Sequence, residues 1–288
     1  MTFFITFRRS GRTGNLIFQY MMCKLLSLHF GHSYISHDEF PADPYGDPNT
    51  FVIDDNNVSD ILHRSNERFD LRTKHLYCNG YFQVSSYYIN KRTELLELLY
   101  DPKNEDVWRD HLNQIVRLSD YTQSTHRVRS LGPNDLVVSL RLDDFIHPKE
   151  TKTNIVPPIY YKRLLSTLQF RHLYIVVDKI RYEWEAAYIS QFAEFKPIIL
   201  QEDLLCDMAL LRDCPRLIHS NSTLCWICSF MSREETKQRF IPITLFYDHQ
   251  YMGAIDEGSD RCMIMEPMKH ADVYKLQNQN KQPPQQHN

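Results

Sequence analysis

The chain has 288 residues, 42% of them hydrophobic and 24% charged, which is long and apolar enough for one large domain or two ordinary ones. A formal net charge of −3 provides no general basic field, which argues against a nucleic-acid polymer as partner. The longest apolar stretch, residues 223–231, is far shorter than the roughly 20 residues that span a bilayer, and the N-terminus is apolar before it is basic, the reverse of a signal peptide.

These features predict a protein without a membrane span in a reducing, cytoplasmic compartment. The 7 cysteines agree with that expectation, because they are odd in number and scattered through apolar runs.

The first half of the chain begins like an α/β domain. Residues 2–7 are aromatic and β-branched and predict a buried strand, and the turn-rich residues 8–15 follow. Apolar residues then recur at helical spacing from Ile17 to Leu28, and Gly31 is placed to end that helix. Further along we expect a loop over 41–60, a strand and turn over 76–83, and helices over 90–100 and 104–118.

In the second half, predicted strands alternate with predicted helices, which is typical of a mostly parallel sheet covered on both faces. The strands are expected at 136–140, 173–177, 197–200 and 216–219, and the helices at 160–168, 182–192, 204–211 and from Ser222 onward. The polar stretch 119–135 is interpreted as a linker. The expected organisation is therefore a first domain over 1–125, a second over 126–275 and a disordered Gln-, Asn- and Pro-rich tail over 276–288.

Three loops combine small residues with hydrogen-bond donors at carboxyl ends of predicted strands, where parallel sheets bind ligands. In residues 11–15, backbone N–H groups before a helix can receive an anion, although an ordinary tight turn has the same pattern. In residues 139–145, Arg141 can grip phosphate with two parallel hydrogen bonds, or can brace the loop through Asp143 or Asp144. In residues 220–223, hydroxyl and amide groups suit phosphate and plain N-capping equally.

Two other signals favour a structural interpretation. Cys225 and Cys228 form a single CxxC pair inside an apolar helix, where cysteine acts as a small hydrophobic residue. The charged run 37–39 is expected to be an exposed loop. The first half has no Asp-x-Asp near a strand end, which argues against the metal-bridged class of sugar transferases.

Taken in order, the motifs of the chain resemble the α-1,2-fucosyltransferases and, more distantly, the protein O-fucosyltransferases. The matching blocks span roughly residues 2 to 235: Gly11-Arg-Thr-Gly14-Asn15-Leu-Ile-Phe18-Gln19-Tyr20, Gly80-Tyr81-Phe82-Gln83 with Tyr87-Tyr88, Ser139-Leu-Arg141-Leu142-Asp143-Asp144-Phe145, Tyr160-Tyr161, Asp178 with Trp184, Asp203-Leu-Leu, and Ser220-Asn-Ser-Thr-Leu-Cys-Trp226.

The resemblance implies a GT-B-like α/β fold, in which two Rossmann-type domains hold a nucleotide-sugar donor in the cleft between them. It implies an inverting glycosyltransferase with no cofactor and no obligatory metal, which moves a sugar, fucose from GDP-fucose in the family, to a hydroxyl of an oligosaccharide or glycoprotein glycan. Arg141 is expected to hold the diphosphate and stabilise its developing charge. The expected donor-binding residues are Gly11, Arg12, Gly14, Asn15, Ser139, Arg141, Asp178, Asn221, Ser222 and Thr223, with Asp178 near the nucleoside.

The chain departs from the family's His-x-Arg-Arg-Gly-Asp-Tyr motif at three positions, where Ser139, Leu142 and Asp143 stand. Each unit charge at 4 Å changes an interaction by about 4 kcal/mol at an effective dielectric of about 20, which is enough to change the donor. A UDP-linked donor such as UDP-xylose is therefore an alternative, and a non-catalytic binding module is another. Asp144 is the candidate base by position, although the leaving diphosphate can take the proton itself.

Overall fold

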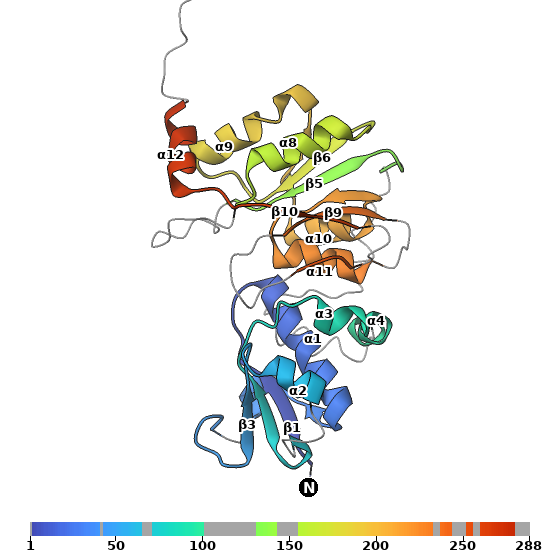
Figure 1. Cartoon of the computed structure of the whole chain (residues 1–288), viewed down its shortest axis with the longest axis vertical. Helices are drawn as coiled ribbons and strands as arrows, with labels where there is room; N and C mark the ends of the chain where they lie inside the picture. The colour runs from blue at the N-terminus through green and yellow to red at the C-terminus, as the bar shows by residue number, and fades with distance from the viewer. Residues whose placement is uncertain are drawn as a thin grey trace, which may run out of the picture. The chain divides into compact units, whose positions relative to one another are not determined.

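The computed structural model describes residues 2–40, 43–64, 71–100, 131–142, 155–232, 237–243, 252–255 and 260–279. The chain divides into two compact units, Met1–Gln123 with Tyr247–Met252 and Ser124–Phe246 with Gly253–Asn288. Both units are α/β structures built on parallel sheets, so the predicted fold class is confirmed (Figure 1). The GT-B arrangement, with a cleft between the units, stays a prediction. Within the described residues, none of the helices has the length and apolar character needed to cross a membrane.

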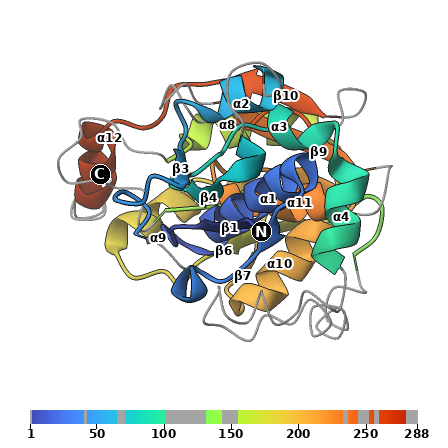
Figure 2. The same ribbon diagram turned by 90° about the horizontal axis from the view of Figure 1, so that it is seen from below.

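Unit 1 contains a 4-stranded parallel sheet in the order β2-β1-β4-β3, in which β1, β4 and β3 lie side by side (Figure 2). Its described strands and α-helices are β1 (Phe4–Phe7), α1 (Thr13–Phe30), β2 (Ser33–Tyr34), β3 (Thr50–Ile53), α2 (Val58–Arg64), β4 (His75–Cys78), α3 (Ser86–Ile89) and α4 (Arg92–Tyr100). As predicted, α1 ends where Gly31 adopts a left-handed φ of 75° and its N–H bonds to the Ser27 carbonyl.

The prediction of a continuous loop over 41–60 is wrong, because β3 and α2 lie there. β3 has only four residues and one is buried, so no long apolar run marks it, and pairing with β4 supplies its order. Before α2, the Asp54 carboxylate accepts the N–H groups of Asn56 and Asn57 at 2.9 and 3.1 Å. This local turn starts a helix in a segment whose composition indicates only a loop.

Unit 2 contains a 6-stranded parallel sheet in the order β10-β9-β8-β5-β6-β7. Its described strands and α-helices are β5 (Leu136–Leu140), α8 (Pro158–Thr167), β6 (Leu173–Val177), α9 (Glu183–Ser190), β7 (Ile198–Leu200), α10 (Leu204–Asp213), β8 (Arg216–Ile218), α11 (Thr223–Met231), β9 (Gln238–Ile243), β10 (Arg261–Ile264) and α12 (His270–Gln279). The strands and helices predicted from β5 to α11 are confirmed. β9, β10 and α12 add to them.

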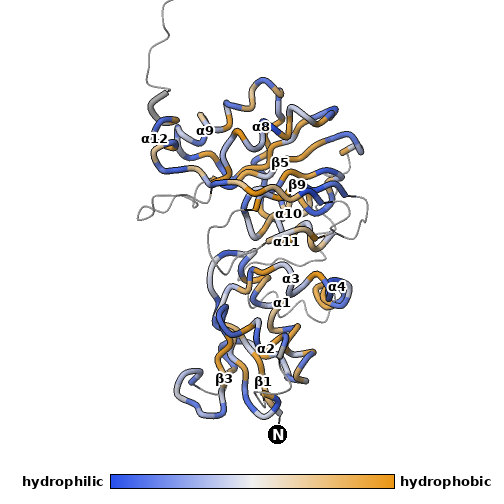
Figure 3. Tube along the Cα trace, in the orientation of Figure 1, coloured by the Kyte–Doolittle hydropathy of each residue, from blue (hydrophilic) through white to orange (hydrophobic). Residues whose placement is uncertain are grey.

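The two faces of this sheet are covered by different helices. Leu136, Val138 and Leu140 of β5 belong to one hydrophobic cluster with α8, α9 and α12. Side chains alternate along a strand, so Val137 and Ser139 face the opposite side, where α10 and α11 lie (Figure 1). Figure 3 shows the hydrophobic residues running along β5, as expected for a strand buried on both faces.

The predicted disordered tail over 276–288 is wrong in its first residues. α12 continues to Gln279, and Val273 and Leu276 are only 3% and 6% exposed. These two residues are three apart, so they share one helix face, which packs against α9. The Gln- and Asn-rich composition concealed this short apolar stripe. Residues 280–288 lie outside the described part of the chain.

Replacing Leu276 with Ala tests this docking of α12. The buried side chain leaves a cavity against the core, so we expect the free energy of unfolding to fall by about 2 to 3 kcal/mol. Lys275→Ala is the matched control, because Lys275 is exposed and its pair with Asp272 is worth at most about 1 kcal/mol. Urea denaturation of the three proteins measures the difference. Equal loss in both variants would contradict the docking.

Candidate functional site

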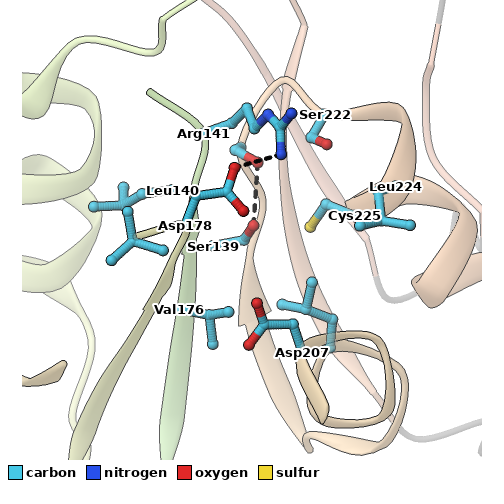
Figure 4. A pocket seen from close by; sticks show the side chains of 12 residues that line it. Ser139, Leu140, Arg141, Val176, Asp178, Asp207, Ser222, Leu224 and Cys225 are labelled. Atoms are coloured by element: carbon cyan, nitrogen blue, oxygen red, sulfur yellow. Dashed lines mark hydrogen bonds and ion pairs between the residues drawn. The ribbon is translucent and has the colours of Figure 1, made fainter. Parts of the chain in front are cut away.

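The order of strands in unit 2 creates a crevice beside β5. The chain passes from β5 to β6 and β7 on one side, and then returns to place β8 on the other side of β5. Loops that leave β5 and β8 therefore diverge, and ligands of parallel sheets bind at such a switch in strand order. A small pocket, partly open to solvent, lies there (Figure 4). Its lining residues are Ser139, Leu140, Arg141, Val176, Val177, Asp178, Asp207, Leu211, Ser220, Ser222, Leu224 and Cys225.

Arg141 and Asp178 form an ion pair in this pocket. Arg141 directly follows β5, and its Nη1 donates to Asp178 Oδ2, which follows β6, at 2.6 Å (Figure 4). The two side chains are 15% and 43% exposed. A guanidinium carries five N–H donors in a planar fork, a geometry that suits a phosphate as well as a carboxylate. As the alternative to a phosphate grip, the sequence predicted Asp143 or Asp144 as the ion-pair partner of Arg141. Both residues, including Asp144 as the candidate base, lie outside the described part of the chain.

A pair of buried serines joins the two strands at the switch. Ser139 Oγ lies 3.1 Å from Ser220 Oγ, and the Ser139 carbonyl accepts a hydrogen bond from Tyr161 Oη at 3.2 Å. Ser222 is the N-cap residue of α11, makes no side-chain capping bond and lines the pocket. Asn221 and Thr223 belong to the same loop but are not among the lining residues. The starts of the two loops are therefore in contact at the carboxyl edge of the sheet, before the loops diverge.

Cys225 and Cys228 lie on the buried side of α11, and both are free thiols. Burial raises the pKa of the Cys225 thiol to about 12, so the thiolate that redox chemistry needs is scarce at neutral pH. Cys225 therefore lines the pocket as a small hydrophobic residue, as predicted for the CxxC pair.

Asp207 is a pocket residue that the sequence did not single out. It lies one turn after Asp203, whose carboxylate caps α10 by accepting the Cys206 N–H at 2.9 Å. Its Oδ1 is buried and has no hydrogen-bond partner among the described atoms. Burial, followed by repulsion from Asp178, Asp203 and Glu202, raises the pKa of Asp207 to about 8. At neutral pH the side chain is therefore mostly a neutral acid, which can both donate and accept a hydrogen bond.

The sequence signal for Asp207 was the spacing of acids at a helix start. Asp203 is the N-cap of α10, and residues four apart share a helix face. Asp207 therefore lies one turn further along the face that begins at the cap. Only the strand order shows that this edge carries the pocket.

Unit 1 has the same kind of switch between β1 and β4. Asn15 Oδ1 accepts a hydrogen bond from Gln83 Nε2 at 2.8 Å, which joins the first turn of α1 to the loop after β4. Gln19 Nε2 donates to the carbonyls of Ser10 and Gly80 at 3.3 and 3.2 Å. Two motifs far apart in the sequence therefore form one polar cluster at the carboxyl edge of the sheet.

Glycine is required at the first position of this cluster. Gly11 has a φ of +82°, and a Cβ there would lie 2.1 Å from Asn15 Nδ2. Arg12 follows as the exposed N-cap of α1, and Gly14 is buried in the first turn.

The predicted donor-binding residues thus fall into two groups. Ser139, Arg141, Asp178 and Ser222 line one pocket in unit 2. Gly11 and Arg12 end the loop after β1 of unit 1, whereas Gly14 and Asn15 lie in the first turn of α1, so the loop predicted over 8–15 is shorter than expected. The donor-binding role of all these residues stays a prediction. Within the described ranges, no three or more His, Cys, Asp or Glu side chains are grouped to hold a metal ion.

No protein-family model matches the chain, and no curated protein matches it. Among solved structures, a variant of Arabidopsis thaliana FUT1 in complex with GDP is 14% identical with a TM-score of 0.42, covering 94% of this chain and 76% of that one. POFUT1 in complex with GDP is 11% identical with a TM-score of 0.38, covering 83% and 97%. E. coli heptosyltransferase WaaC with ADP is 9% identical with a TM-score of 0.39, covering 96% and 99%. These values are too low to transfer a function to this chain.

Asp207→Asn tests the protonation of the pocket acid. Between about pH 4, where an unfolded Asp titrates, and about pH 8, the folded protein keeps a proton that the unfolded chain has lost. Asp207 therefore lowers stability progressively as pH rises through this window, by at most about 1.4 kcal/mol per pH unit before solvent screening. Asn has no such cost, so the variant should become more stable than the wild type toward pH 8.

Urea denaturation from pH 5 to pH 8 measures the stability difference, with the exposed Asp272→Asn as control. Parallel pH profiles for the wild type and Asp207→Asn would show that Asp207 is ionised in the folded protein.

Proposed function

We propose that this chain is a glycosyltransferase that moves a sugar from a nucleoside-diphosphate sugar to a glycan hydroxyl. The observation that supports this most is the place of Arg141, at the carboxyl end of β5, at the switch in strand order, and inside a pocket with the hydroxyl groups of Ser139, Ser220 and Ser222. The order of motifs that resembles the α-1,2-fucosyltransferases supports GDP-fucose as donor. UDP-xylose is the alternative donor.

In the proposed reaction the acceptor hydroxyl attacks the anomeric carbon as the bond from that carbon to the diphosphate oxygen breaks. Negative charge grows on the departing diphosphate, and we assign its stabilisation to Arg141, whose side chain is only 15% exposed. The proton of the acceptor passes to a phosphate oxygen of the leaving group unless Asp144 takes it. The proposed mechanism inverts the configuration and requires no metal.

Asp178 limits how strongly the free pocket attracts an anion. Its carboxylate already neutralises Arg141, and a phosphate entering at about 4 Å would be repelled by about 4 kcal/mol at an effective dielectric of about 20. A diphosphate must therefore share Arg141 or displace Asp178. In either case, the proposal places Asp178 beside the diphosphate, where it competes for Arg141, and not beside the nucleoside as expected from the sequence.

Arg141→Ala should weaken nucleotide binding. Loss of a charge-assisted pair of hydrogen bonds costs about 1.5 to 3 kcal/mol, which corresponds to roughly a 10- to 100-fold rise in Kd. Calorimetry with GDP, UDP, GDP-fucose and UDP-xylose measures this, with the exposed Arg163→Ala on α8 as control. A wild-type protein that binds none of the four at millimolar concentration would falsify the proposed function. Unchanged binding by Arg141→Ala would remove only the assignment of Arg141.

Asp178→Asn should tighten the binding of GDP or UDP several-fold. The amide keeps the shape of the side chain and can still accept from Arg141, while the repulsion of the incoming diphosphate disappears. The same calorimetry gives the change in Kd. Weaker binding by the variant would instead support a direct contact between Asp178 and the nucleoside.

A nucleotide-sugar-binding module without turnover is the second candidate. The observation that favours it is Leu142, which stands where the related motif has its second arginine and is only 2% exposed in the core of unit 2. Incubation with donor sugar and a panel of acceptors, followed by detection of released nucleotide, separates the two candidates. Tight binding with neither transfer nor hydrolysis would favour the module.

A further inference from the structure

The loop that follows β4 in unit 1 is held by hydrogen bonds to several distant side chains. Residues 80–83 follow β4, and the Asp55 carboxylate accepts the N–H groups of Tyr81 and Phe82 at 2.9 and 2.7 Å. Tyr88 Oη donates to the Phe82 carbonyl at 2.7 Å, and Gln19 donates to the Gly80 carbonyl. Side chains from three other parts of unit 1 therefore hold the backbone of three consecutive residues.

The backbone of this loop is strained. Phe82 has a φ of +55°, a conformation that costs a non-glycine residue about 1 to 3 kcal/mol and persists only where surrounding contacts impose it. Phe82 is fully buried, whereas Tyr81 beside it is 37% exposed. The strained turn thus sends one aromatic side chain into the core and holds its neighbour at the surface.

Tyr81 is fixed at both ends. Its N–H is bound by Asp55, and its Oη accepts a hydrogen bond from Ser10 Oγ, in the loop after β1, at 3.1 Å. The ring lies at the carboxyl edge of the sheet, where the Asn15 and Gln83 amides also meet. An exposed ring that is already ordered loses little conformational freedom when it binds a ligand.

We propose that Tyr81 is the stacking platform for a pyranose ring of a neutral glycan, the acceptor of the transfer; the identity of that ligand rests on the proposed function. A pyranose offers an apolar face of C–H groups, which packs on an aromatic ring, and a rim of hydroxyl groups. The Tyr81 ring supplies the first partner, and the hydroxyl groups of Tyr81 and Ser10, which lie in contact at the surface, supply polar partners for the second. A neutral sugar suits the ring because the contact needs no charge partner.

Tyr81→Ala and Tyr81→Phe test the platform. Ala removes the ring, so we expect the KM for a neutral oligosaccharide acceptor to rise at least about tenfold, with kcat at saturating acceptor and the Kd for GDP or UDP unchanged. Phe keeps the ring and loses only the bond to Ser10, so it should stay within about threefold of the wild type. Tyr274→Ala, an exposed tyrosine of α12, is the matched control.

The probes are lactose, cellotetraose and xylotetraose, each measured both as acceptor and by saturation-transfer NMR without nucleotide, after equal melting temperatures show that the variants fold. Wild-type-like sugar binding by Tyr81→Ala overturns the platform, as does a wild type that binds nucleotide but none of the three sugars. A lower nucleotide affinity of Tyr81→Ala overturns it too, because the ring would then stack on the base. Tyr81-dependent sugar binding without any nucleotide binding keeps the platform and removes the transferase.

Discussion

In unit 2, β8 returns to the opposite side of β5 from β6, and the position of every pocket residue depends on this switch in strand order. The loops after β5 and β8 must leave in different directions, which keeps the edge between them open. Ser139 and Ser220 join the strands across that edge, so Arg141 and the start of α11 approach the same space. Without the switch, the same side chains would be covered by a crossing helix.

The pocket carries its own charge partners. Asp178 neutralises Arg141, and Asp207 avoids a further negative charge by staying protonated at neutral pH. This arrangement lets a partly buried guanidinium remain in the free protein without an uncompensated charge. An anion that approached Arg141 would therefore compete with Asp178 for the guanidinium.

Unit 1 also has a switch in strand order, but the side chains beside that switch are mostly neutral. Its switch lies between β1 and β4, and its polar cluster is built from amides, a hydroxyl and the Asp55 carboxylate. Both carboxylate oxygens of Asp55 accept backbone N–H groups, so Asp55 fixes the conformation of the loop after β4. In this conformation the side chain of Tyr81 is exposed. The polar cluster of unit 1 thus presents mainly neutral groups and an exposed aromatic residue, whereas the Arg141 pocket presents charged groups.

The sequence by itself determined the α/β class, the C-terminal end of α1 and the strands and helices from β5 to α11, because buried runs, helical spacing and a terminal glycine act within a few residues. It also indicated the three loops that carry Arg141, Ser222 and Gly11. It missed β3, α2 and α12, which have little apolar pattern and are ordered by pairing or packing with distant segments. Only the tertiary structure decided that Arg141 pairs with Asp178, that Asn15 meets Gln83 and that Asp207 enters the pocket. Strand order sets these contacts, and no local pattern of residues encodes strand order.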